Sequence, residues 1–333
     1  MTLWERVKDL AVEVDSYELE TLRIVVGEMT RKTTVVHLHG GVEEGIGEDI
    51  TYEVATHDAA AAAGPVLALA GSSSLAGFSA RLDEVGLMDD YTRWAYESAA
   101  LDLALRQAGR SLANAVDRSV RPLRFVVSTR GDIRAWLELS PTLRFKIDAR
   151  NGWTDEIVSE LAATGAVDVV DLKGHYRGEW VDADPGPELY SRVVHAFPDA
   201  YIEDAWIDEH TRPVLEPHRD RLTWDAPIHS VADVESLPFA PRTLNSKPSR
   251  FGTVQRLFEF YDYCDAHGIA VYGGGQWELG PGRGQIQLLA SLFHPDAPND
   301  VAPGVYNEGD PRPGLPTSPL MVRPRASGFT VDS

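Results

Sequence analysis

The sequence has almost no cysteine: Cys264 is the only one among 333 residues. A single thiol cannot form an intramolecular disulfide, so the fold depends on packing, and a reducing compartment is expected. Cys264 falls on the apolar side of a predicted helix, which favours a core residue over a nucleophile. The N-terminal residues MTLWERVK lack the apolar segment of a signal peptide. We therefore expect a cytoplasmic protein.

Basic residues are also scarce, 31 against 51 acidic residues, which gives a formal charge of −20. A surface this acidic repels phosphate backbones, so neither a nucleic acid nor an anionic membrane surface is expected as a partner. No apolar run approaches the roughly 18–20 residues needed to cross a bilayer. The hydrophobic share of 43% is nevertheless usual for a protein with a large core. A small anion could still bind in a local basic pocket.

Three charged residues in the second half of the chain stand 22 positions apart: Glu203, Asp225 and Lys247. Each ends a short apolar run of strand character, and a helix-like stretch follows each one. One strand, one helix and two short loops occupy about 20–25 residues. Repeated βα units with charged residues at the C-terminal strand ends are how a (β/α)8 barrel forms its active site.

The same alternation of strand and helix begins after Pro122. Strands this apolar indicate a parallel sheet buried on both sides, and eight of them indicate closure into a barrel. A helix with Val254 and Cys264 on one face separates the sixth strand from the seventh. The predicted strands are 124–128, 143–148, 167–173, 201–204, 222–225, 243–247, 269–273 and a short eighth near 300–305.

Before the barrel the pattern predicts a small antiparallel meander and a helix. His37 and His39 share one strand face, but a lone pair lacks further ligands, so half-exposed strand histidines are favoured over a metal site. The predicted strands are 20–26, 33–39 and 47–54, with residues 27–32 joining the first two and glycines 40, 41 and 45 at the second turn. Helices are predicted to begin within 59–63 and to run from 91 to 107.

Asp171, Glu203 and Asp225 end three consecutive predicted strands. Carboxylates that close would repel one another unless a cation neutralised them. Oxygen ligands favour a hard divalent ion, which predicts Mg²⁺, with Mn²⁺ as the alternative. The competing interpretation is that each acid pairs with a base such as Lys173 or Arg250.

Lysines flank this predicted metal site, Lys146 on the second strand and Lys247 on the sixth. A lysine can act as a base, and a metal-bound carboxylate can lose its α-proton because the metal stabilises the resulting negative charge. Alternatively, each lysine is an ion-pair partner of a barrel acid. The glycine-rich segment 273–284 follows the seventh strand and indicates a loop that lines a pocket, with Glu278 as a candidate substrate ligand.

Several motifs resemble the enolase superfamily, above all its muconate lactonizing subgroup, which includes o-succinylbenzoate synthases and dipeptide epimerases. The motifs lie across nearly the whole chain and are most similar from 200 to 304. They are KPSRFG at 247–252, YDYCDAHGI at 261–269, GGQWELGPGRG at 274–284, IED at 202–204, SAALDLAL at 98–105 and GIGE at 45–48.

The resemblance implies an α+β capping domain, here residues 1–118, on a (β/α)7β TIM-like barrel, here 119–305. Residues 306–333 would pack back on the capping domain. It implies Mg²⁺ bound by Asp171, Glu203 and Asp225, and acid/base roles for Lys146 and Lys247. The connection from Gly27 to Thr33 would be the mobile specificity loop of the family, where Arg31 could meet a distal anionic group of the substrate.

Two departures from the family pattern concern the second strand. The family has Lys-x-Lys with the second lysine catalytic, whereas this chain has Lys146-Ile147-Asp148. In addition, the segment that begins at Asp148 resembles the one after the first metal ligand of the family. Counting strands favours Asp171 as that ligand, because its distance of 32 residues from Glu203 suits one βα unit.

The sequence thus predicts a Mg²⁺-dependent lyase or isomerase that removes the proton α to the carboxylate of a small substrate. A dehydration of the o-succinylbenzoate synthase type is favoured over cycloisomerisation or epimerisation. A class I aldolase with a Schiff base on Lys247 is one alternative. A barrel that binds a ligand without turnover, suggested by Asp148, is another. A homo-oligomer is compatible with the sequence.

Overall fold

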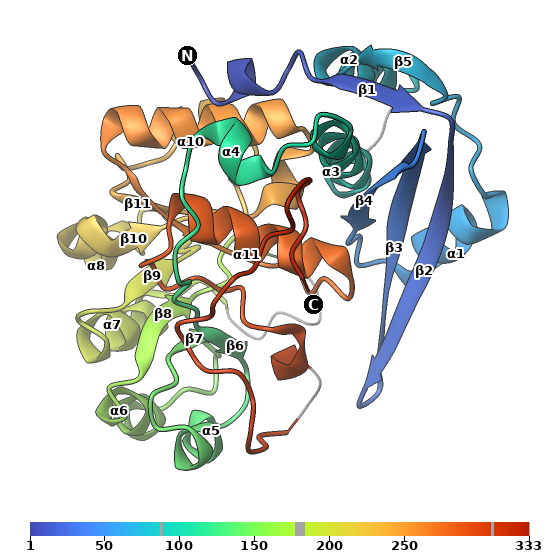
Figure 1. Cartoon of the computed structure of the whole chain (residues 1–333). Helices are drawn as coiled ribbons and strands as arrows, with labels where there is room; N and C mark the ends of the chain where they lie inside the picture. The colour runs from blue at the N-terminus through green and yellow to red at the C-terminus, as the bar shows by residue number, and fades with distance from the viewer. Residues whose placement is uncertain (87–88, 177–183, 308–309, 333) are drawn as a thin grey trace.

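A computed structural model describes residues 1–86, 89–176, 184–307 and 310–332. A three-stranded antiparallel sheet with its helices lies beside a ring of parallel strands enclosed by helices (Figure 1). The predicted fold class is therefore confirmed: a (β/α)7β TIM-like barrel carries an α+β capping domain. No helix within these ranges is both long and apolar enough to cross a membrane. Gly309, in the predicted C-terminal segment, lies outside the described residues.

The capping sheet differs from the predicted meander in the length of its first hairpin. Its strands β2 and β3 are joined by a two-residue turn, in which Gly27 adopts φ +59°. The predicted 27–32 connection is therefore wrong, because residues 29–32 already pair with β2 and place Arg31 opposite Ile24. Alternating apolar residues and threonines favour continued strand on both sides of the turn. The strands are β2 (Ser16–Val26), β3 (Met29–Gly40) and β4 (Glu43–Asp49).

The end of the sheet also differs from the prediction. Strand β4 stops at Asp49 rather than at residue 54, and helix α1 (Val54–Ala63) begins five residues before the predicted start. His57 explains the earlier start, because its buried ring bonds Thr34 Oγ1 and the Thr51 carbonyl, each at 2.8 Å. Hydrophobic periodicity could not predict these hydrogen bonds of His57, because the surrounding sequence is mostly alanine.

Helix α3 (Asp90–Gln107) packs directly on β4 (Figure 1). Two glycines of β4 permit this close approach. A Cβ atom at Gly45 would lie 2.3 Å from the Ala99 carbonyl oxygen, and one at Gly47 would lie 2.1 Å from that of Ala95. The small residues of α3 and the glycines of β4 therefore form one contact. The other capping elements are η1 (Trp4–Arg6), β1 (Ala11–Val14), β5 (Gly71–Ser74), α2 (Leu75–Glu84) and α4 (Leu112–Val116).

The parallel strands of the barrel follow one another in sequence order. Five form one sheet in the order β10-β9-β8-β7-β6, and β11 pairs with β12. The Asn245 amide donates to the Trp224 carbonyl at 3.1 Å and links the two sheets. They are β6 (Val127–Thr129), β7 (Phe145–Asp148), β8 (Val167–Asp171), β9 (Tyr201–Glu203), β10 (Leu222–Thr223), β11 (Thr243–Ser246) and β12 (Ala270–Gly273).

The eighth position of the barrel is shorter than predicted. Asn299 bridges to Phe125 and Asp300 bridges to Gly274, which closes the ring between the first strand and the seventh. The predicted eighth strand near 300–305 is found only as the bridge at Asp300, and its later part is wrong because residues Gly304–Asn307 form the 3₁₀ helix η4.

Helices cover the outside of the barrel (Figure 1). Cys264 is buried on α10, as predicted. The helices are α5 (Ile133–Leu139), α6 (Asp155–Ala163), α7 (Pro187–Ala196), α8 (Arg212–Leu215), α9 (Val231–Glu235), α10 (Val254–His267) and α11 (Pro281–Phe293), with 3₁₀ turns η2 (Glu216–Arg221) and η3 (Pro248–Phe251).

Glu48 joins the capping sheet to the barrel. Its buried carboxylate accepts hydrogen bonds from the backbone amides of Leu279, Gly280 and Gly282, at the start of α11. A helix N-terminus presents unpaired amides and a positive dipole end, so it binds a carboxylate well. The C-terminal segment adds a second link, since the Phe329 amide donates to Asp102 of α3.

We predict that Gly47→Ala destabilises the protein by about 1–3 kcal/mol, because overpacking a tight contact forces backbone shifts. Gly152→Ala is the matched control, since a Cβ there meets nothing within 4 Å. Urea unfolding followed by circular dichroism measures both. Equal midpoints for the two variants would contradict the role assigned to the β4–α3 contact.

Candidate metal centre and barrel mouth

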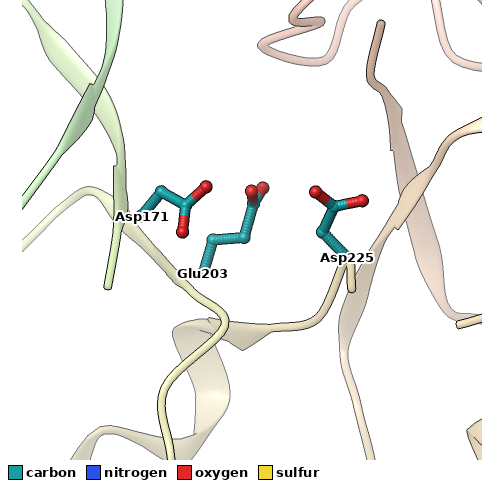
Figure 2. A group of neighbouring side chains, drawn as sticks. All are labelled: Asp171, Glu203 and Asp225. Atoms are coloured by element: carbon teal, nitrogen blue, oxygen red, sulfur yellow. The ribbon is translucent and has the colours of Figure 1, made fainter. Parts of the chain in front are cut away.

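Asp171, Glu203 and Asp225 come together at the mouth of the barrel. Asp171 ends β8, Glu203 ends β9, and Asp225 follows β10 by two residues. Each offers one carboxylate oxygen, and these oxygens all lie within 4.8 Å of one another. Glu203 stands between the other two (Figure 2), and all three side chains are buried. The 22-residue interval between Glu203 and Asp225 therefore corresponds to neighbouring strand ends.

Lys146 on β7 lies inside this acidic group. Its ammonium donates to Glu203 Oε1 and lies 3.4 Å from Asp171 Oδ2 and 3.6 Å from Asp300 Oδ2. Only 2% of its side chain is exposed. A buried ammonium is stable only among opposite charges, so Lys146 and the acids stabilise one another.

Lys247 and Arg250 approach the group from the other side, through Asp225. Lys247 Nζ lies 2.7 Å from Asp225 Oδ2, and Arg250 Nη1 lies 3.1 Å from Asp225 Oδ1. Lysines from β7 and from the end of β11 therefore lie on either side of the three carboxylates, and each is paired with a barrel acid, as the alternative interpretation of the sequence has it.

Two neutral side chains that the sequence reasoning missed orient Glu203. The Tyr272 hydroxyl donates to Glu203 Oε2, and Asn245 Nδ2 donates to the same oxygen at 3.0 Å. Asn245 stands two residues before Lys247 on the same strand face, which is a signal that strand alternation could have given. Nothing in the local sequence marks Tyr272, because its partner lies 69 residues away.

The carboxylates experience very different electrostatic surroundings. Burial, together with repulsion from Asp171 and Asp225, raises the pKa of Glu203 to about 8 despite the opposing charge of Lys146. Burial acts in the same direction on Asp171, yet Lys173 and Lys146 hold the pKa of Asp171 well below its usual range. Of the three carboxylates, Glu203 is therefore the one whose ionised form is least favoured, and a further cation would favour that form.

Asp148, the alternative first ligand, lies apart from this group. Its carboxylate pairs with Arg130 Nε at 2.7 Å and with Lys173 Nζ at 3.4 Å. Lys173 also pairs with Asp171 and so connects the two acids. Asp148 and Asp171 are register partners on β7 and β8, but only Asp171 joins Glu203 and Asp225. The sequence analysis named Lys173 as a possible ion-pair partner of a barrel acid, and the structure shows it paired with both Asp148 and Asp171.

The two candidate substrate ligands are both engaged within the protein. Arg31 is buried and donates to four backbone carbonyls, those of Ile50, Thr51, Gln276 and Trp277. Glu278 accepts from the Gln276 amide at 2.7 Å and pairs with Arg283 at 2.9 Å. The structure places both at the junction of capping domain and barrel, with their charges already compensated.

Backbone strain is concentrated at the barrel mouth. Of the four non-glycine residues with positive φ among those described, Lys173, Asp204 and Trp277 follow barrel strands β8, β9 and β12. Such conformations are rare and cost of order 1–3 kcal/mol each, and they are typical of functional sites. The strain coincides with the end of the barrel that carries the acids.

The arrangement fits a divalent ion. Three buried carboxylate oxygens within 4.8 Å of one another supply the hard ligands that Mg²⁺ or Mn²⁺ prefers. A divalent ion would also oppose the effect of burial, which raises the pKa of Glu203.

Family models match both parts of the chain. The C-terminal domain of the domain of unknown function DUF8230 matches residues 119–308, and the N-terminal domain of the same family matches residues 5–115. The boundary between the two matches lies at the end of α4.

Solved structures of the enolase superfamily share the whole fold. A dipeptide epimerase from Methylococcus capsulatus, complexed with Mg ion, has a TM-score of 0.75 at 17% identity, covering 96% of this chain and 99% of that one. Muconate lactonizing enzyme from Pseudomonas putida has a TM-score of 0.69 at 18% identity, covering 96% and 97%. The expected resemblance is therefore confirmed for the fold.

Curated relatives match over short segments only. N-Succinylamino acid racemase from an Amycolatopsis species is 39% identical over 71 residues, which is 21% of this chain and 18% of that protein. o-Succinylbenzoate synthase from Bacillus subtilis (strain 168) is 36% identical over 61 residues, 18% and 16% of the two chains. The match thus spans less than a fifth of either relative.

We predict that Lys146→Met lowers the free energy of unfolding by about 3–5 kcal/mol, because it leaves buried carboxylates without their cation. The double variant Lys146→Met/Glu203→Gln should recover much of that loss, since it removes the carboxylate that Lys146 contacts. Denaturant unfolding without divalent ions measures both. A single variant as stable as the parent protein would show that the ammonium does not balance the acids.

Proposed function

Because the chain belongs to the DUF8230 family and has the fold of the enolase superfamily, we propose that it is a Mg²⁺-dependent enzyme that removes the proton α to a substrate carboxylate. The observation that carries this proposal is the group of three buried carboxylates with a lysine on either side. Mn²⁺ could replace Mg²⁺ because the ligands are all oxygen atoms. A small carboxylate is the proposed substrate.

Asp171, Glu203 and Asp225 are the proposed metal ligands. A divalent ion at this site would bind the substrate carboxylate and stabilise the negative charge that develops on it when the α-proton leaves. Tyr272 and Asn245 hold the Glu203 carboxylate in position through Oε2. Metal ligands oriented in this way bind more tightly than mobile ones.

Lys247 is the proposed base. Asp225 orients its side chain at the end of β11 through Oδ2, and Arg250 pairs with the other oxygen of the same carboxylate. Lys146 approaches from β7 and is the proposed second acid/base group, on the opposite side of the three carboxylates. Lys146 contacts more acids than Lys247 does, and these acids favour its protonated form. A lysine that stays protonated can stabilise the negative charge of the intermediate.

Dehydration of the o-succinylbenzoate synthase type is our first candidate for the complete reaction, because it requires only one base. The α-proton passes to Lys247 Nζ, the α-carbon electron pair forms the new double bond, and the β-hydroxyl leaves. The proton on Lys247 then goes to that hydroxyl, so the products are an unsaturated carboxylate and water. Epimerisation needs a proton donor on the opposite face, which would be Lys146.

A barrel that binds a carboxylate without turnover is the second candidate. The observation that favours it is Asp148, which stands where the family has its strand-two lysine and is paired with Arg130 and Lys173. Exchange of substrate α-protons distinguishes the two candidates, because binding alone does not break the carbon–hydrogen bond.

We predict that Asp171→Asn weakens Mg²⁺ binding by at least about tenfold, as loss of a ligand should cost no less than loss of a residue that orients one. Asp148→Asn is the matched variant and should change the affinity by less than about threefold, because Asp148 is not a ligand in this assignment. Calorimetric titration measures both. The reverse order of effects would assign the first ligand to Asp148.

We predict that Lys247→Ala slows α-proton exchange at least about 100-fold, the usual contribution of a general base. Lys8→Ala, outside the barrel between η1 and β1, is the control and should exchange at the parental rate. Proton NMR of a panel of small carboxylates in D₂O with Mg²⁺ measures the exchange. Exchange that persists in Lys247→Ala would remove Lys247 from the mechanism, and no exchange in the parent protein would favour the binding barrel.

A further inference from the structure

The capping domain and the loop after β12 meet through a chain of neutral side chains. Tyr52 follows β4, and its hydroxyl lies 3.3 Å from Gln276 Oε1. Gln276 Nε2 donates in turn to the hydroxyl of Tyr91, in the first turn of α3, at 2.9 Å. We call Tyr52, Tyr91, Gln276 and Trp277 the neutral patch.

The neutral patch adjoins the proposed base. Gly274, where the loop leaves β12, lies so close to Lys247 that a Cβ there would be 2.7 Å from Lys247 Cε. Burial raises the pKa of the Tyr52 phenol, and Lys247 and Arg31 act against that effect. About half of the Tyr52 surface remains exposed, while its hydroxyl is hydrogen-bonded to Gln276. A substrate held at Lys247 would therefore extend toward these side chains.

The cations near the neutral patch are already paired, including Lys247, whose ammonium lies 2.7 Å from Asp225 Oδ2. Arg31 gives its donors to four backbone carbonyls and covers the Tyr52 ring at 4.6 Å. Lys32 pairs with Asp58, and Arg283 pairs with Glu278. Residues 1–118 also contain twenty acidic residues and ten basic ones. A second carboxylate would meet no unpaired cation among these residues.

Trp277 adds an unsatisfied donor and local strain. Its φ of +59° is rare for a bulky side chain. Its indole Nε1 is buried and has no hydrogen-bond partner among the described residues. A buried donor without a partner costs free energy, so a ligand that supplies an acceptor would gain from it. Strain of this kind persists where the fold holds a residue ready for a ligand.

We propose that the neutral patch binds an uncharged hydrogen-bonding group of the substrate, such as a carboxamide, and discriminates against a second carboxylate there. This inference rests on the proposed function, because it takes the reacting carboxylate to lie at the three acids. It also replaces the expectation that Arg31 meets a distal anion.

The hydrogen-bonding groups of the patch suit an amide. The Trp277 N–H can donate to a carbonyl oxygen, and the Tyr52 oxygen can accept from an amide N–H. A carboxylate could accept from Trp277, but it would lose its hydration without gaining a cation, and it would face the acidic capping domain. The amide therefore keeps the favourable contact without the desolvation of a charge.

Calorimetric titration of two probes that differ only at the distal end tests the proposal. The probes are N-succinyl-L-phenylalanine and its distal carboxamide, each added to the full-length protein with Mg²⁺. We expect the carboxamide to bind at least about tenfold more tightly than the dicarboxylate. The distal carboxylate would lose its hydration without gaining a cation, and an unpaired buried group costs about this much in affinity. Trp277→Phe should reduce this preference by about threefold or more, whereas Trp4→Phe, on η1, should leave it unchanged.

Tighter or equal binding of the dicarboxylate would overturn the proposal, and so would failure of both probes to bind at millimolar concentration. A preference that Trp277→Phe leaves intact would overturn the role of the indole. These results are separate from those that test the proposed function. α-Proton exchange with Mg²⁺ dependence can persist while the dicarboxylate binds better, and then only the neutral patch is wrong.

Discussion

Burial of like charges at the barrel mouth is the constraint on which the rest of the site depends. Asp171, Glu203 and Asp225 cannot all be ionised in a buried space without cations between or beside them. Lys146 meets this need from one side, and Lys247 with Arg250 meets it from the other. The lysines that the proposed chemistry uses are therefore also the groups that make the acidic centre stable. A divalent ion would compensate Glu203, whose pKa remains raised.

The joint between capping domain and barrel follows the same principle of compensated burial. Glu48 is buried because the N-terminus of α11 offers it three amides. Arg31 is buried because four carbonyls accept from it, two of them in the loop after β12. These contacts hold that loop against the capping sheet, and the loop leaves β12 at Gly274, next to Lys247. The proposed specificity at the mouth is thus linked to the interface between the capping domain and the barrel.

The sequence predicted the barrel and its acidic strand ends because both are periodic. A βα unit has a narrow range of lengths, so residues 22 positions apart, such as Glu203, Asp225 and Lys247, lie at the ends of neighbouring strands. Local pattern failed where tertiary contacts decided the outcome. Helix α1 begins early because His57 is anchored by Thr34 and Thr51, and the eighth strand is reduced to bridges at Asn299 and Asp300.

By itself, the sequence determined the class of fold, the lysines on the second and sixth strands, and the three acids, because strand periodicity and charge placement are local properties. Only the tertiary structure decided which acids share one centre and which charges remain free. Asp148 and Asp171 both end barrel strands, yet only Asp171 points into the group with Glu203 and Asp225. The sequence suggested Arg31 as a ligand for an anion, but in the structure Arg31 donates to backbone carbonyls up to 246 residues away. Ion pairing depends on the distance between charged atoms in the folded protein, which the spacing of residues in the sequence does not determine.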